Sequence, residues 1–393
     1  MLWNIYFSDL DIPIHNDDVL LNGLPVSHVE QADDVAIWSM SPEGLQVKLD
    51  AFFLWCLRNS MVISIKKTKW MLFGCLPRTL PVFLIDSKPI ELVDSYKYVG
   101  LQFISTHRYI LQTVYNIKAS KARNITRAMF ALELAIGCLP PREGIILYMA
   151  RVDPHLIFGC EIVLDIDLSL LGDLEQAQCQ YLRRLLGISK RSMRAILFTE
   201  LGIEPIRYRR LGLALGYLQS LLIQPDHRVV RDAFTHLLHL ARSGHATWVN
   251  DLRSTLSKLP IPVHCTVDEL TDADNLARLR KDIRQSCEQS LTSDIQASVR
   301  VHLLHNRLEF REDGQQLHTS PIITLRAYLD VIKVPKHRHA FTRLITSSHA
   351  LSIERLRYEE RYRSPIPREW RLCHFCRGAV EDECHALMHR TLF

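Results

Sequence analysis

Short apolar and polar runs alternate through the first hundred residues, which predicts strands joined by tight turns. Residues 25–30 are polar and β-favouring, and residues 35–38 form an apolar run of strand length. Asp33 and Asp34 lie between the two runs. The pattern therefore predicts a hairpin with both carboxylates at its tip.

A helix is predicted directly after this hairpin. Ser41 is a good N-cap and Pro42 suits the first helical position. Apolar residues then recur at helical spacing through residue 57, so this helix should pack under the strands. Residues 83–92 predict another hairpin, and the β-rich region should end near residue 105.

Helical periodicity dominates from about residue 108 onward. One predicted helix carries apolar residues on one face and basic residues on the other. A second covers residues 174–186 and ends at Gly187, a typical C-capping residue. The basic positions of these helices are Lys118, Lys121, Arg123, Arg183 and Arg184, followed by Arg207, Arg209 and Arg210.

The rest of the chain also predicts helices. Residues 226–330 carry no assignable motif and contain a proline-rich linker at 259–262. A basic helix should open at residue 336 and continue through residue 363, including Arg355 and Arg357. We therefore expect an α+β protein, with an antiparallel sheet and a helix followed by mainly helical segments. The expected segments are residues 1–105, 106–225, 226–330 and 331–393.

Composition changes this picture little. The 393 residues are 47% hydrophobic and 23% charged, as in ordinary globular chains. No apolar run reaches the roughly 18–20 residues that span a bilayer, and the N-terminus lacks the pattern of a signal peptide. The ten cysteines are scattered, which favours reduced thiols. These features predict a nuclear or cytoplasmic protein with no membrane partner, and they leave its oligomeric state open.

Charge is distributed unevenly. Residues 1–60 contain nine Asp or Glu against two Lys or Arg, whereas the remainder contains 34 against 46. An acidic start that holds the Asp33-Asp34 turn is thus followed by a basic excess. Such an excess suits a phosphate backbone, although solvated helices also carry one.

Two clusters could bind metal. Adjacent carboxylates such as Asp33 and Asp34 suit Mg²⁺, although aspartate is also simply a good turn residue. The C-terminal region has the spacing Cys-x2-Cys-x8-His-x3-His, which can close a tetrahedral zinc site. The four predicted zinc ligands are Cys373, Cys376, His385 and His389, with His374 and Cys384 as spare donors.

Four segments, in this order and spacing, resemble the reverse transcriptases of non-LTR retrotransposons. Residues 2–10 resemble the tail of the family's template-binding palm helix, and residues 31–34 its aromatic-Ala-Asp-Asp hairpin, with Gln31 in the aromatic position. Residues 64–74 resemble the next palm strand, and residues 96–101 the primer grip. A weaker resemblance to family thumb and tail regions continues to the C-terminus.

The resemblance implies RNA-directed DNA synthesis with an RNA template, a DNA primer and two Mg²⁺ ions. Asp33 and Asp34 would hold metal, and Lys67 would lie near the incoming triphosphate. Residues 98–100 would position the primer. The implied primer-grip residues are Tyr98, Val99 and Gly100, and the basic positions of the thumb and tail would contact phosphates.

The chain departs from the family in two places. The family's third metal-binding aspartate lies on an earlier strand, and only 32 residues precede Asp33 here. We therefore expect a palm that lacks its fingers and is inactive alone. The family often ends in Cys-x2-Cys-x8-His-x4-Cys, whose last cysteine is Arg390 here, so His389 or Cys384 would have to serve as the fourth ligand.

Two other interpretations stay open. The chain could be a non-catalytic nucleic-acid-binding remnant with a zinc-binding tail, or a decayed reading frame without a function. The first predicts salt-dependent binding to nucleic acid without nucleotide incorporation.

Overall fold

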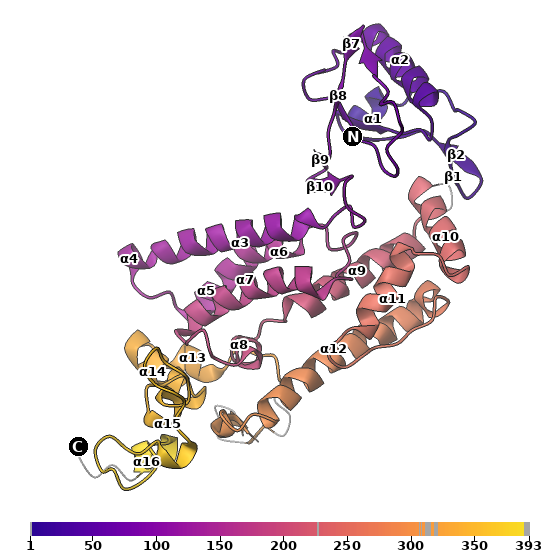
Figure 1. Cartoon of the computed structure of the whole chain (residues 1–393). Helices are drawn as coiled ribbons and strands as arrows, with labels where there is room; N and C mark the ends of the chain where they lie inside the picture. Colours follow the sequence, from indigo (N-terminus) through magenta and orange to yellow (C-terminus); the bar gives the residue numbers. More distant parts are fainter. Residues whose placement is uncertain are drawn as a thin grey trace.

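A computed structural model shows a small β-containing N-terminal region, a long helical body and a compact tail (Figure 1). The N-terminal region comprises residues 2–105, the helical body residues 106–305 and the tail residues 321–388. The coarse α+β class is confirmed. The structure describes residues 2–225, 228–305, 307, 309–310, 316–317 and 321–388.

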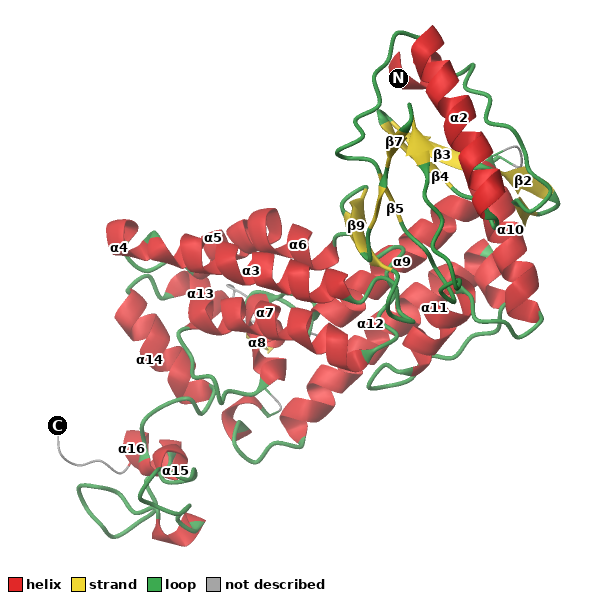
Figure 2. Ribbon diagram, turned by 45° about the horizontal axis from the view of Figure 1, so that its top comes forward, coloured by secondary structure: helices red, strands yellow, loops and turns green. Residues whose placement is uncertain are grey.

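The N-terminal region consists of paired short strands around one long helix (Figure 2). Its helices are α1 (Leu2–Tyr6) and α2 (Pro42–Arg58). Its antiparallel pairs are β1 (Val19–Leu21) with β2 (Leu24–Val26), β3 (His28–Gln31) with β4 (Asp34–Ile37), β6 (Leu84–Ile85) with β7 (Lys88–Pro89), and β9 (Ser95–Tyr98) with β10 (Leu101–Ile104). β5 (Lys69–Trp70) pairs in parallel with β8 (Glu91–Leu92).

Local sequence signals explain α2 and its packing. The Ser41 side chain accepts a hydrogen bond from the Gly44 backbone N–H at 3.3 Å, and Pro42 opens the helix, as predicted. One face of α2 packs on the strands, where Leu49 joins the cluster of Trp70, Phe83, Ile85 and Ile90. Lys48 is fully buried on the same helix, where its ammonium group contacts the Asp18 carboxylate.

The strands differ from the prediction in two ways. The strand expected over residues 64–74 is limited to β5, because Lys67 lies in a turn closed by a 3.0 Å hydrogen bond from its N–H to the Ser64 carbonyl. The described strands also form separate pairs, one of them parallel, and not one antiparallel sheet. The β1–β2 hairpin was not predicted, although Asn22-Gly23 is a strong hairpin signal.

The helices of the body, except the short and exposed α4, share one hydrophobic core that begins at Leu101 and extends through α12. In sequence order they are α3 (Thr113–Ala131), α4 (Glu133–Ile136), α5 (Pro141–Leu147), the π-helix Tyr148–Val152, α6 (Asp153–Ile157), α7 (Leu168–Leu186), α8 (Arg194–Leu201), α9 (Ile206–Leu222), α10 (Val229–Arg242), α11 (Trp248–Ser257) and α12 (Ala273–Gln296). The predicted stop of α7 is confirmed, since Gly187 adopts a left-handed conformation with φ of 65°.

Arg210 is the most deeply buried cation of the helical body, with 4% of its surface exposed. Its guanidinium lies 2.8 Å from the Asp165 carboxylate and donates to the carbonyls of Leu156 at 2.7 Å and Val163 at 3.0 Å. The Tyr115 hydroxyl donates to the same carboxylate at 2.9 Å. The expectation that this arginine adds to a phosphate-binding surface is therefore wrong.

The tail is built from short helices at the end of the molecule opposite the N-terminal region (Figures 1 and 2). They are α13 (Ala327–Val331), α14 (Pro335–Ile345), α15 (Ser352–Arg355) and α16 (Glu383–Met388). The single basic helix expected from residue 336 through residue 363 is therefore wrong, because it breaks after Ile345. In the described part of the chain, no helix has the length and apolar character needed to cross a membrane.

Candidate nucleic-acid interface and metal centre

The predicted carboxylate hairpin forms as expected. Gln31 pairs with Asp34 across a two-residue turn of Ala32 and Asp33, and Ala32 has a positive φ of 54°. Both aspartates are exposed at the tip. Their carboxylates are therefore available to a cation, but no third His, Cys, Asp or Glu in the described residues joins them in a ligand cluster.

The predicted primer-grip residues form the turn of the β9–β10 hairpin. Val99 and Gly100 have φ values of 45° and 82°, as a type I′ turn requires. A Cβ on Gly100 would lie 2.7 Å from the Cζ atom of Phe158, so only glycine permits this close approach. The hairpin tip is therefore held against the helical body just after α6.

The structure brings the three N-terminal site segments near one another. The Tyr96 hydroxyl donates to the Lys67 carbonyl at 3.1 Å, which ties the lysine turn to the β9–β10 hairpin. The pKa of Tyr98 is raised by burial and further by the negative charge of Asp34. Lys67 is exposed but lies on a turn, not on the predicted strand.

A group of cations surrounds the contact between the hairpin and the helical body. The Lys118 ammonium lies 3.4 Å above the Phe158 ring, the same ring that touches Gly100. Burial, together with the charges of Lys121 and Lys97, lowers the pKa of Lys118 to about 8. We call Lys97, Lys118, Lys121, Arg151 and His155 the junction cluster.

The junction cluster concentrates positive charge. Burial lowers the pKa of His155, with further lowering by Lys118, Lys121 and Arg151. No carboxylate in the described part of the chain forms an ion pair with these lysines or with Arg151. Like charges held together without a counterion are unfavourable, so phosphate groups would stabilise the cluster.

Sequence reasoning found only part of this cluster. Lys118 and Lys121 were predicted from the basic face of α3, whereas Lys97, Arg151 and His155 were missed. Lys97 lies within the primer-grip segment itself and could have been found there. Arg151 and His155 carry no local signal, because the π-helix and α6 bring them to α3 only through tertiary packing.

Most of the predicted phosphate-binding arginines are already occupied within the protein. Arg123 lies 3.3 Å from Asp173, Arg184 lies 2.7 Å from Glu133, and Arg183 donates to the Ser192 carbonyl at 3.2 Å. In the tail, Arg355 is exposed but Arg357 lies 2.9 Å from Glu354. These arginines stabilise helix contacts, so their charges are partly compensated.

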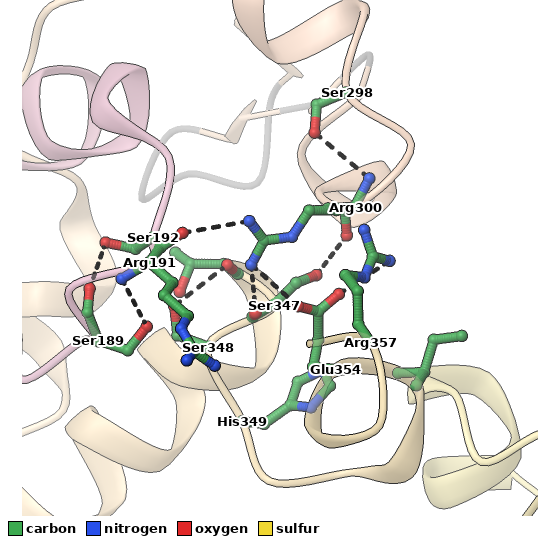
Figure 3. Close-up of polar contacts among 12 residues, drawn as sticks. Ser189, Arg191, Ser192, Ser298, Arg300, Ser347, Ser348, His349, Glu354 and Arg357 are labelled. Carbon is green, nitrogen blue, oxygen red and sulfur yellow. Dashed lines mark hydrogen bonds and ion pairs between the residues drawn. The ribbon is translucent and has the colours of Figure 1, made fainter. Parts of the chain in front are cut away.

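Figure 3 shows why Arg357 is not a free surface charge. Glu354 lies between Arg357 and Arg300, and Arg300 donates to it at 2.9 Å. Arg300 also donates to the carbonyls of Arg191 at 3.2 Å and Ser347 at 3.4 Å. Arg300, in the loop after α12, thus joins the loops after α7 and α14 to Glu354 of α15, and this network fastens the tail to the helical body.

Three of the four predicted zinc ligands lie together. The Cys373 and Cys376 thiols and a His385 ring nitrogen lie within 4.8 Å of one another, and Cys376 Sγ is 3.3 Å from His385 Nε2. In the described residues they form the one such donor group. Cys384 and His374 do not join it, and His389 lies outside the described residues.

The local fold around these donors is that of a thiolate knuckle. Arg377 has a φ of 56° and its N–H donates to the Cys373 carbonyl at 3.0 Å, which closes the turn between the cysteines. Hydrogen bonds to the Cys373 thiol, the largest contribution coming from the Cys376 backbone N–H and smaller ones from the Phe375 N–H and the His385 side chain, lower its pKa to about 7. Two close thiols, one of them readily ionised, and an imidazole are donors that suit Zn²⁺.

Comparisons with known proteins do not extend this description. A scan against protein-family models found no match, and a search of curated proteins found no significant match. The resemblance to reverse transcriptases therefore rests on the four sequence segments named above.

Proposed function

We propose that this chain is a nucleic-acid-binding protein derived from a non-LTR retrotransposon reverse transcriptase. Residues 1–105 would be part of the palm, the following helices the thumb, and residues 331–393 a zinc-binding tail. The observation that carries the proposal is the shared contact at Phe158, where the primer-grip-like turn meets the uncompensated lysines of the junction cluster.

The proposed ligand is a duplex of RNA template and DNA primer. The phosphate backbone of the primer strand would lie over Lys97, Lys118 and Lys121, which are on β9 and α3. Lysine ammonium groups contact phosphates as point charges and read no base edges. Binding should therefore tolerate any sequence and should weaken steeply with salt.

We expect replacement of both Lys118 and Lys121 by glutamine to weaken binding to an RNA–DNA duplex. Log affinity falls with log salt concentration, and each lost phosphate contact should make this slope shallower by roughly 0.7–0.9. The slope of the double variant should therefore be shallower by roughly 1.4–1.8 than that of the unmodified chain. Fluorescence anisotropy with a labelled duplex at several salt concentrations measures both quantities.

The matched control is the double replacement of Lys281 and Lys336 by glutamine. Both are exposed helical lysines outside the junction cluster, and the net charge changes equally. If both double variants bind alike, the attraction is general and the junction cluster is not the site.

Binding to the duplex should also depend on pH. Because the pKa of Lys118 is about 8, affinity should fall between pH 7 and pH 9, and Lys118→Arg should remove this dependence.

We expect no nucleotide incorporation by this chain alone. Two Mg²⁺ ions and a triphosphate need more ligands than the exposed carboxylates of Asp33 and Asp34. Primer extension on an RNA template, with Mg²⁺ or Mn²⁺, provides the measurement. Incorporation that Asp33→Ala abolishes would overturn this expectation and would restore the full polymerase as the function.

The second candidate function is binding without any link to polymerisation, as in a non-catalytic remnant with a zinc-binding tail. The absence of a third carboxylate beside Asp33 and Asp34 in the described residues favours it. A primer terminus distinguishes the two. A duplex with a recessed primer end should bind more tightly than a blunt duplex only if the palm-like hairpins still hold that end.

A further inference from the structure

Lys118 differs from the other lysines of the junction cluster in its surroundings. It is half-buried at the contact between the β9–β10 hairpin and the helical body, whereas Lys97 and Lys121 are exposed. Its Nζ atom lies 3.4 Å above the Phe158 ring, and the same ring touches Gly100 of the hairpin. The amine of Lys118 is therefore held in one place by packing, as the amine of a surface lysine is not.

The amine of Lys118 is accessible to a reagent. In the described part of the chain its Nζ has no hydrogen-bond or ion-pair partner, and it is not one of the polar atoms that are shielded from solvent. The Phe158 ring approaches the amine, yet the atom keeps contact with solvent. A small molecule in solution can therefore reach Nζ, and no protein group has to leave it first.

The surroundings of Lys118 favour the uncharged amine, which is the nucleophilic form. Burial and the positive charges of Lys121, one turn along α3, and of Lys97 on β9 lower the pKa of Lys118 to about 8. The attraction of the Phe158 ring for the ammonium form is smaller than this shift, so the pKa stays depressed. Near pH 7.5 roughly a quarter of the Lys118 amines are therefore uncharged, against about 0.1% for an ordinary lysine.

The remaining charges of the junction cluster indicate which electrophile would react. Lys121 and Arg151 lie near His155, and all three lie near Lys118. Cations held together without a carboxylate attract phosphate groups. An acyl phosphate carries such a group directly beside an electrophilic carbonyl carbon. We propose that Lys118 is an acylation site whose substrates are small acyl phosphates.

The reaction is an acyl transfer from oxygen to nitrogen. The lone pair of Nζ attacks the carbonyl carbon and forms the amide bond, while the bond from that carbon to the phosphate oxygen breaks and phosphate leaves with the electron pair. The proton lost by the amine goes to the released phosphate. Lys121 and Arg151 would stabilise the negative charge of the leaving group. The product is a neutral acyl-lysine, so the junction cluster loses one positive charge.

Acylation of Lys118 would also regulate the site proposed for nucleic acid. This consequence rests on the proposed function, whereas the acylation itself needs no nucleic acid. Loss of one phosphate contact should make the slope of log affinity against log salt shallower by roughly 0.7–0.9.

Treatment of the full chain with acetyl phosphate tests the proposal, with acetylation of each lysine followed by quantitative mass spectrometry. The reference is Lys281, an exposed lysine of α12 outside the junction cluster. A less basic amine is a weaker nucleophile, so near pH 7.5 we expect Lys118 to react about 10-fold faster than Lys281, which is less than the ratio of uncharged fractions. The rate at Lys118 should level off above about pH 9, whereas the rate at Lys281 should keep rising. Equal rates and parallel pH profiles would overturn the proposal.

A variant and a second reagent test the role of the neighbouring cations. Lys121→Gln removes one charge beside Lys118 and should slow its acetylation, whereas Lys336→Gln changes an exposed lysine of α14 and should not. With a neutral acetylating reagent, acetylimidazole, the ratio of the Lys118 rate to the Lys281 rate should be smaller than with acetyl phosphate, because the cluster attracts only the anionic donor. An equal ratio for the two reagents would contradict acyl phosphates as the substrate class.

Duplex binding separates this proposal from the proposed function. After brief treatment with acetyl phosphate, which modifies mainly Lys118, fluorescence anisotropy should show weaker binding of the RNA–DNA duplex. Lys118→Arg keeps the charge and cannot be acylated in this way, so the same treatment should leave its binding unchanged. Rapid acetylation of Lys118 without loss of duplex affinity would overturn binding at the junction cluster and support the acylation site, whereas slow acetylation of Lys118 in a chain that binds the duplex would overturn the acylation site alone.

Discussion

Replacing Arg210 by methionine is expected to lower the free energy of unfolding of the helical body by about 3–5 kcal/mol. The substitution leaves the Asp165 carboxylate, itself 3% exposed, without its cation. It also leaves the carbonyls of Leu156 and Val163 without a donor. Urea unfolding followed by far-UV circular dichroism measures the change, because most of the helix lies in this body.

Two further variants test whether the loss of stability in Arg210→Met comes from the unpaired Asp165 carboxylate or from replacing an arginine by methionine in general. Arg127→Met removes an exposed arginine of α3 and should change stability by no more than about 0.5 kcal/mol. Adding Asp165→Leu to Arg210→Met should recover part of the loss, since no uncompensated carboxylate remains buried and Tyr115 keeps the Leu164 carbonyl as acceptor. A loss for Arg210→Met no larger than that for Arg127→Met would contradict the assigned role.

Removal of zinc is expected to unfold the end of the tail. Residues 371–388 have few buried apolar side chains, so the fold there should depend on the metal. Binding of structural zinc contributes about 10–16 kcal/mol in zinc-finger peptides. We expect one zinc per chain by elemental analysis, and its loss in Cys376→Ser.

The contacts of Glu381 and of Glu383, the first residue of α16, define where the effect should spread. Glu381 accepts from the Ser352 hydroxyl at 2.7 Å, and Glu383 accepts from Ser347 at 3.0 Å and from the His349 ring at 2.8 Å. Hydrogen exchange should therefore rise over residues 371–388 and also over residues 347–354 after chelation, but not in α3 or α7.

Cysteine variants outside the donor group are the controls for zinc. Cys75→Ser should keep the metal, because this thiol lies in the N-terminal region. Cys384→Ser is not a control but identifies the fourth ligand: zinc should stay if His389 serves and should be lost if Cys384 serves. Absence of stoichiometric zinc, or hydrogen exchange in the tail that does not respond to chelator, would show that these residues do not form a zinc site.

Local sequence determined the features that depend on neighbouring residues. Ser41 and Pro42 begin α2, Gly187 ends α7, and the polar tip between two β-favouring runs gives the Asp33-Asp34 hairpin. Caps and tight turns are made by residues a few positions apart, so their chemistry is legible in one sequence. The Cys373, Cys376 and His385 donors belong to the same class, because they are separated by only a short loop.

Tertiary structure alone decided which cationic side chains are paired with a carboxylate and which are not. Arg123 and Arg184 look like surface cations of amphipathic helices, yet Asp173 and Glu133 compensate them from positions about fifty residues away. Arg210 is buried by Asp165, 45 residues earlier in the chain. Helical periodicity assigns a charged residue to a face but does not say what packs on that face. For the same reason two uncompensated cations, Lys97 on a strand and Lys118 on a helix, are brought together only by the folded contact at Phe158.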